Sequence, residues 1–168
     1  EVLKDHPDMP MPPQYPLRAF YSAQQHFPAS TRLFINEVTG ESWQNYHREY
    51  TPYALLIEHL RQKGAKIGGI GLQCHLFSES LHYDVIAGKA MRPHELFRAL
   101  DLYAQYNVPL HVSEITIPTL PNNTAQGAEN QAKLTRNFYR LWFSHPAVEA
   151  IIWWNLADGT AVAGEDKW

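Results

Sequence analysis

Short apolar runs alternate along the chain with longer segments in which apolar residues recur every three or four positions. The recurring spacing is that of one face of a helix, whereas a short and nearly continuous apolar run is typical of a strand buried on both faces. On this basis we predict helices at residues 17–27, 46–63, 92–106 and 125–144. Strands are predicted at residues 32–36, 67–75, 108–117 and 150–156. The alternating order and the continuous apolar runs favour a parallel sheet connected by helical crossovers.

Proline and glycine mark several of the predicted ends. Residues 5–16 contain five of the twelve prolines, which predicts a loop before the first helix. Gly64 is placed to cap the end of the second helix, and Pro93 fits the first turn of the third.

The number of strands limits the architecture. Four strands do not close a barrel, and a complete (β/α)8 barrel needs about 250 residues, whereas this chain has 168. The sequence therefore predicts an α/β fold that is either half of such a barrel or a small open sheet with helices on both faces.

Composition and charge exclude several classes of function. The chain has 14 Lys and Arg against 17 Asp and Glu, so its net charge is −3, and no basic cluster suggests nucleic-acid binding. No apolar run is long enough to span a membrane. The single cysteine, Cys74, excludes an internal disulfide and a multi-cysteine metal site. The chain does not start with an initiator methionine, and its first residues lack the charged start and apolar stretch of a signal peptide, so we expect a processed or trimmed chain.

Polar residues gather at the predicted strand ends. Asn36 ends the first strand, Gln73 and His75 end the second, and Glu114 lies inside the third. The carboxyl ends of parallel strands are where α/β proteins assemble their sites. Residues two apart on a strand share a face, so Gln73 and His75 are expected on one side, with Glu114 beside them. A carboxylate in an apolar strand is costly unless it is paired or used, so this group is either a satisfied core pair or a functional site.

Other residues carry weaker signals. Trp153 and Trp154 follow one another at the end of the last predicted strand, so we expect one ring in the core and the other pointing to the barrel interior or its mouth. Cys74 should face away from its two neighbours into packing. The nine histidines lack the spacing of metal ligands, and no nucleotide-binding or nucleophile-elbow motif is present, so we predict neither metal nor cofactor.

Several segments, in order along the chain, are similar to the motifs of one enzyme family. Residues 33–37 read LFINE and resemble LFxND, and residues 69–76 read GIGLQCHL and resemble GIGLQxHL. Residues 112–117 read VSEITI and resemble the strand TELDI. Residues 145–151 and 154–158 resemble the family's HPAVxGI and WGLxD segments. Together these motifs resemble the C-terminal half of the barrel of glycoside hydrolase family 10, the endo-1,4-β-xylanases.

The resemblance implies a retaining mechanism, in which two carboxylates act on one glycosidic bond. Glu114 matches the nucleophile of the family strand. Glu1, in a start similar to the end of the family's WDVxNE motif, matches the acid/base residue.

Further roles follow from the same resemblance. His75 is expected to orient Glu114, with Asn36 and Gln73 in the same polar network. Trp154 is expected to form one side of a sugar subsite. The family implies xylan or a xylo-oligosaccharide as the substrate, and its chemistry requires no cofactor or metal.

The resemblance also implies an incomplete domain. Residues 1–168 would form part of a catalytic domain, without the N-terminal half of the barrel and without its final helix. The outer strands would then present unpaired edges, so we expect the chain to pair with a second copy or with the missing half, or to close these edges by rearrangement. The family implies a secreted or periplasmic enzyme. We expect the chain by itself to hydrolyse xylan weakly or not at all.

Three positions depart from the family pattern. Ile115-Thr116 stands where the family usually has Leu-Asp, Glu37-Val38 replaces Asp-Tyr, and Asn155 replaces a glycine. None of these changes removes a catalytic carboxylate. Two other interpretations remain open. One is a non-catalytic carbohydrate-binding or scaffold fragment, which would not need two facing carboxylates. The other is an unrelated open α/β hydrolase, which would show a different strand order.

Overall fold

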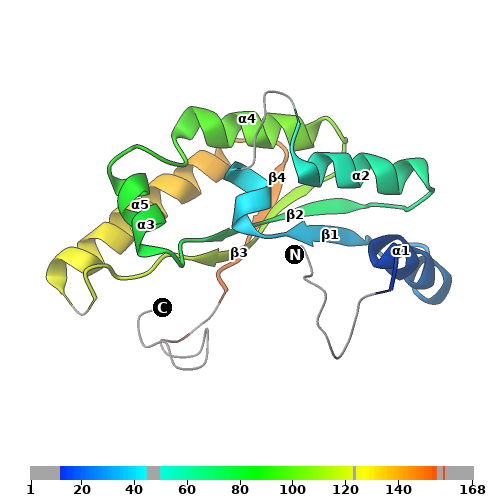
Figure 1. The fold of residues 1–168 in the computed structure, drawn as a ribbon, viewed down its shortest axis with the longest axis horizontal. Coiled ribbons are helices and arrows are strands. Elements are labelled where there is room, and N and C mark those ends of the chain that lie inside the picture. The colour runs from blue at the N-terminus through cyan, green and yellow to red at the C-terminus, as the bar shows by residue number, and fades with distance from the viewer. Residues whose placement is uncertain (1–11, 45–49, 123, 155–156, 158–168) are drawn as a thin grey trace.

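The computed structural model describes residues 12–44, 50–122, 124–154 and 157. Four parallel strands form one sheet in chain order (Figure 1). They are β1 (Phe34–Glu37), β2 (Gly69–His75), β3 (Leu110–Thr116) and β4 (Val148–Ile151). This sheet confirms the predicted α/β fold. Its consecutive strand order is that of a segment of barrel wall, not of a doubly wound sheet.

Helices connect the strands, and α2 and α4 lie over the same face of the sheet (Figure 1). The helices are α1 (Tyr15–His26), α2 (Pro52–Gln62), α3 (Glu79–Ile86), α4 (Pro93–Ala104) and α5 (Ala125–Phe143), with a π-helical turn η1 (Gly40–Gln44) after β1. The sequence pattern does not predict η1 or α3. Apart from α2 and β4, the predicted elements agree with the observed ones to within two residues at each end.

The ends of α2 follow from local chemistry. The hydroxyl of Thr51 accepts a hydrogen bond from the backbone N–H of Ala54, 2.9 Å away, and Pro52 opens the helix. The predicted start at residue 46 is therefore wrong. At the other end, Gly64 has a φ of 90°. The N–H of Gly64 donates to the carbonyl of Arg61 and that of Ala65 donates to Leu60. This pair of bonds confirms the predicted glycine cap.

The sheet is curved. Arg32, just before β1, and Glu149, in β4, form an ion pair with Nη1 and Oε2 3.2 Å apart. Arg32 precedes one outer strand and Glu149 lies in the other, and a flat sheet would hold these two strands roughly 14 Å apart. The pair therefore reaches across the concave face, which corresponds to the interior of a barrel.

The last strand ends earlier than predicted, at Ile151 rather than at residue 156. The chain nevertheless continues beside β3. Ile152 N–H donates to Val112 O at 2.9 Å, and Trp154 N–H donates to Ile115 O at 3.0 Å. The two donors are two positions apart in this segment, whereas their acceptors are three positions apart in β3. This mismatch breaks the even spacing of a parallel ladder.

No described helix is both long enough and apolar enough to cross a membrane.

Candidate active site

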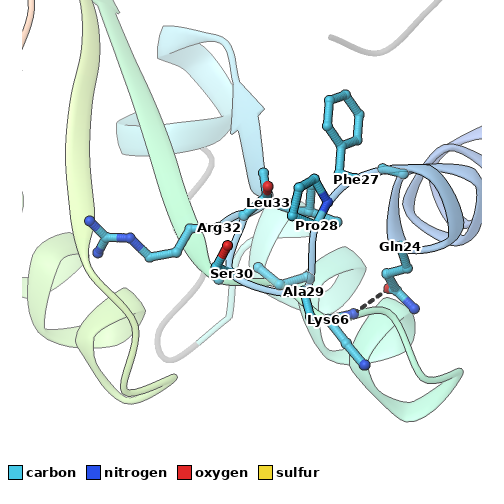
Figure 2. A pocket seen from close by; sticks show the side chains of 12 residues that line it. Gln24, Phe27, Pro28, Ala29, Ser30, Arg32, Leu33 and Lys66 are labelled. Carbon is cyan, nitrogen blue, oxygen red and sulfur yellow. Dashed lines mark hydrogen bonds between the residues drawn. The ribbon is translucent and has the colours of Figure 1, made fainter.

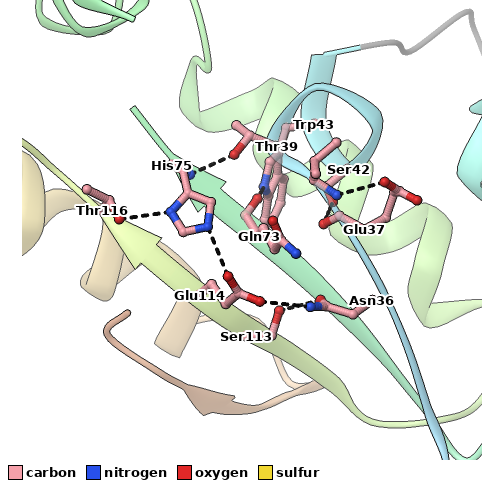
Figure 3. Close-up of polar contacts among 11 residues, drawn as sticks. Asn36, Glu37, Thr39, Ser42, Trp43, Gln73, His75, Ser113, Glu114 and Thr116 are labelled. Atoms are coloured by element: carbon pink, nitrogen blue, oxygen red, sulfur yellow. Dashed lines mark hydrogen bonds and ion pairs between the residues drawn. The ribbon is translucent and has the colours of Figure 1, made fainter. Parts of the chain in front are cut away.

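Polar side chains from three neighbouring strands meet on the concave face of the sheet, toward the carboxyl ends of its strands (Figure 3). Asn36 comes from β1, Gln73 and His75 come from β2, and Glu114 comes from β3. The prediction that His75 and Glu114 lie side by side is confirmed, since Nε2 of His75 lies 3.1 Å from Oε2 of Glu114 on the neighbouring strand.

An extra residue in β3 shapes this cluster. Gly71 pairs with His111 and Gln73 pairs with Glu114, so two steps along β2 correspond to three along β3. Such a bulge suspends the alternation of side chains between the two faces. As a result, two consecutive residues, Ser113 and Glu114, both reach Asn36.

The carboxylate of Glu114 is held from both sides. Its Oε1 accepts a hydrogen bond from Nδ2 of Asn36 and its Oε2 accepts one from Nε2 of His75, each at 3.1 Å. The Glu114 side chain is 18% exposed. The carboxylate is therefore fixed in orientation and still accessible from the concave face.

Asn36 is oriented in turn by its neighbours. Oγ of Ser113 donates a hydrogen bond to Oδ1 of Asn36 at 2.5 Å, which leaves the amide N–H of Asn36 directed at Glu114. Gly71 lies between the two outer partners. A Cβ at this glycine would lie 2.4 Å from Oδ1 of Asn36 and 3.1 Å from Oγ of Ser113. The contact across β2 therefore requires a residue without a side chain.

His75 is buried and surrounded by specific contacts. Its Nδ1 lies 2.8 Å from Oγ1 of Thr116, and its backbone N–H donates to Oγ1 of Thr39 at 2.6 Å. Phe77 stacks on the imidazole with ring centroids 4.5 Å apart. Burial lowers the pKa of His75, and this effect outweighs the opposing hydrogen bond and charge of Glu114.

Gln73 shares the face but not the hydrogen bonds of this cluster. Its backbone carbonyl accepts a bond from Nε1 of Trp43 at 2.8 Å. Within the described part of the chain, its side-chain amide has no hydrogen-bond partner. The expected contribution of Gln73 to the polar network thus remains a prediction.

Exposed aromatic rings border the cluster. Trp154 meets the edge of His75, with ring centroids 5.8 Å apart. Trp153 and Trp154 are 36% and 47% exposed, and Phe77 is 42% exposed. The prediction that one tryptophan belongs to the core is wrong, because both rings are exposed in the segment that follows β4.

Some predicted residues lie elsewhere. Glu1, the expected acid/base residue, is outside the described residues, so its distance from Glu114 is not described. Cys74 is fully buried on the opposite side of β2, as predicted, and burial raises the pKa of its thiol. Within the described ranges, no group of three or more potential metal ligands is found.

Thr116, Ser113 and Phe77 lie at the site but are not among the residues predicted for it. Thr116 could have been found, because it lies two residues after Glu114 and so shares its face. Ser113 could not, because ordinary alternation turns it away from Glu114 and only the bulge brings it back.

A pocket of about 350 Å³ lies at the opposite ends of the strands (Figure 2). It is lined by residues at the end of α1, such as Gln24 and Phe27, and by residues before β1 and β2, such as Arg32 and Lys66. Oε1 of Gln24 accepts a hydrogen bond from the backbone N–H of Lys66 at 2.7 Å. The pocket shares no residue with the Glu114 cluster.

Comparison with known proteins gives a consistent result. The family described as glycosyl hydrolase family 10 matches residues 10–165. Endo-1,4-β-xylanase 2 of Arabidopsis thaliana is 29% identical over 137 residues, which cover 82% of this chain and 11% of that protein.

Solved structures agree in fold. The xylanase XynB of Paenibacillus barcinonensis, complexed with a conduramine derivative, matches with a TM-score of 0.71 at 23% identity, covering 100% of this chain and 54% of that one. The xylanase 10B of Thermotoga petrophila RKU-1, in complex with xylobiose, matches with a TM-score of 0.70 at 18% identity, covering 92% of this chain and 44% of that one. The chain thus spans about half the length of these solved chains. Its fold is that of half a (β/α)8 barrel.

Proposed function

Because the chain belongs to glycosyl hydrolase family 10, we propose that it carries the nucleophile of a retaining endo-1,4-β-xylanase, and that this nucleophile is Glu114. The observation that carries the proposal is the setting of this carboxylate. It lies near the carboxyl end of β3, partly exposed, with each oxygen accepting one hydrogen bond from a neighbouring strand. Such a preorganised carboxylate at a barrel's catalytic face suits attack on a sugar.

The reaction requires two carboxyl groups about 5–5.5 Å apart. An oxygen of Glu114 attacks the anomeric carbon while the bond from that carbon to the leaving sugar oxygen breaks. Glu1 is proposed as the acid that gives its proton to the leaving oxygen. Glu1 then takes a proton from water, which attacks the same carbon and releases Glu114.

The surrounding residues support this chemistry. Asn36 and His75 hold the two oxygens of Glu114, so that the carboxylate is in position before the sugar arrives. The exposed rings of Phe77 and Trp154 border the same place and are proposed to pack against a sugar ring.

Xylan or a xylo-oligosaccharide is the proposed substrate. The Thermotoga petrophila relative was solved with xylobiose, which supports this choice. Residues 1–168 are proposed to be part of a catalytic domain. The remaining sugar subsites are proposed to come from the other half of the barrel.

The test is to label the nucleophile, in a protein that contains this chain within a complete barrel. A 2-fluoro xylobioside with a good leaving group should form a stable glycosyl ester on the peptide that contains Glu114, detected by mass spectrometry. Glu114→Ala should abolish the adduct and lower kcat/KM for xylan by about 10⁴-fold or more. Glu129→Gln, at an exposed position of α5, is the matched control and should change neither.

Two outcomes would contradict the assignment. Labelling of a different residue would show that Glu114 is not the nucleophile. Binding of xylo-oligosaccharides with neither labelling nor hydrolysis would instead support a non-catalytic carbohydrate-binding role.

A further inference from the structure

Thr116 is the last residue of β3 and lies on the side of His75 away from Glu114 (Figure 3). Its side chain is buried, and its Oγ1 lies 2.8 Å from Nδ1 of His75. Within the described part of the chain, this imidazole is the only hydrogen-bond partner of the hydroxyl. Both nitrogens of His75 are therefore engaged, one by Thr116 and the other by Glu114.

The two contacts determine where the ring proton lies. A carboxylate oxygen can only accept, so the hydrogen bond to Glu114 requires a proton on Nε2 of His75. In the neutral ring, Nδ1 then carries a lone pair, which accepts from the hydroxyl of Thr116. If Nδ1 were also protonated, it would donate to Thr116, and the buried hydroxyl proton would lose its acceptor. Leaving a buried donor unpaired is unfavourable.

Among the described residues, Glu114 is the charged group that acts on His75. Glu114 on β3 favours a charged ring, and Glu37 on β1 uses Oε1 to accept from the backbone N–H of Val38. Phe77 on the β2 side and Trp154 after β4 are uncharged. Burial lowers the pKa of His75 despite Glu114, in agreement with the hydrogen-bond argument.

We propose that Thr116 is a positioning residue that holds His75 in its neutral form, with the proton on Nε2, so that Glu114 accepts its hydrogen bond from an uncharged ring. The family pattern has aspartate at this position. A carboxylate there could only accept, and it would draw a second proton onto the imidazole. Threonine can donate a hydrogen bond to Nδ1, so it disfavours a second proton on the imidazole. The importance of this for catalysis rests on the proposed role of Glu114, but the state of the ring does not.

The experiment measures the ring directly in the 168-residue chain. Two-bond ¹H–¹⁵N correlation spectra of the histidine side chains are recorded between pH 5 and 8, with His75→Gln used to identify the resonances. In the native chain we expect a protonated Nε2 and an unprotonated Nδ1 at pH 7. The titration midpoint should lie below about 6.5, the value of an unperturbed histidine.

Variants at position 116 separate a positioning role from a structural one. Thr116→Asp should raise the midpoint by about 1–3 pH units by placing a negative charge beside Nδ1. Valine has nearly the same shape as threonine but no hydroxyl. Thr116→Val should therefore shift the Nδ1 resonance toward that of an unprotonated imidazole nitrogen that accepts no hydrogen bond. Thr116→Ser should restore the native resonance.

The proposal is overturned if His75 is doubly protonated in the native chain at pH 7, or if its proton is on Nδ1. It is also overturned if Thr116→Val leaves the Nδ1 resonance unchanged. If Thr116→Asp does not fold, the Val and Ser variants decide. Since no turnover is measured, a failed nucleophile assignment would leave these results intact.

Discussion

Gly71 is the residue on which the geometry of the Glu114 cluster depends most directly. Asn36 and Ser113 come from strands on either side of β2, and their side chains meet over this glycine. Even the smallest side chain would place a carbon 2.4 Å from Oδ1 of Asn36. The glycine therefore permits a contact between two strands that are not neighbours.

Gly71→Ala should displace Asn36 and lower the free energy of unfolding by about 1–3 kcal/mol, as overpacking does elsewhere. The measurement is urea unfolding of single and double variants. In an Asn36→Ala background the same change should cost less, because the atom that clashes is gone. Gly40→Ala is the control, since a Cβ there would meet nothing within 4 Å. An equal loss in free energy of unfolding from Gly71→Ala in both backgrounds would contradict a clash with the Asn36 side chain.

At the scale of elements, helix α3 buries a histidine, His82, which its sequence pattern does not predict. The helix begins after Ser78, whose hydroxyl accepts from the backbone N–H of Leu81 at a long 3.4 Å. One turn later, His82 is fully buried. Neither of its ring nitrogens has a hydrogen-bond partner among the described residues. Burial lowers the pKa of His82, so the folded chain binds its proton less readily than the unfolded chain.

This difference gives the stability a definite pH dependence. Above the unfolded pKa of about 6.5, His82 is neutral in both states. As the pH falls below that value, the unfolded state takes up the proton first, so the folded state loses stability. His82→Leu should remove this loss.

The expected gain in free energy of unfolding for His82→Leu is about 1–3 kcal/mol at pH 8, from removal of an unpaired buried polar group. The gain should be larger at pH 5. Denaturant unfolding at both pH values gives the comparison. His59→Leu, at an exposed position of α2, should show no comparable pH-dependent gain. A His82 variant that is equally stabilised at both pH values would contradict the argument.

At the scale of the whole molecule, the described residues form a curved sheet, covered by helices, whose two outer strands each pair on one side only. Within the described residues, β1 pairs with β2 alone and β4 pairs with β3 alone. Each outer strand therefore presents backbone groups that another strand can bind. The Arg32–Glu149 pair crosses the concave face, but both side chains are more than half exposed, so it contributes little stability.

We predict that the purified 168-residue chain associates through these edges and hydrolyses xylan poorly. Light scattering over a range of concentrations should give a mass above the 19.3 kDa of one chain. A reducing-sugar assay on the same samples should show little product. Strong activity from a monomer would contradict both expectations.

Much of the fold was predictable because its signals are local. Strand and helix periodicity, prolines and a glycine cap act within a few residues, so the four strands and four of the five described helices could be located from the sequence. The order of strands followed from the alternation of elements. The pairing of His75 with Glu114 was predictable for the same reason, because both lie near the carboxyl ends of adjacent parallel strands.

Only the tertiary structure decided how these residues hold one another. The bulge in β3 depends on hydrogen bonds between strands about 40 residues apart in sequence, and no local pattern encodes it. It brings Ser113 to Asn36, and Gly71 makes room for them. The contacts of Thr116 with His75 and of Asn36 with Glu114 follow from that register. The sequence by itself thus determined which residues could form a site, whereas strand register and sheet curvature decided which atoms meet, because both arise from contacts between distant segments.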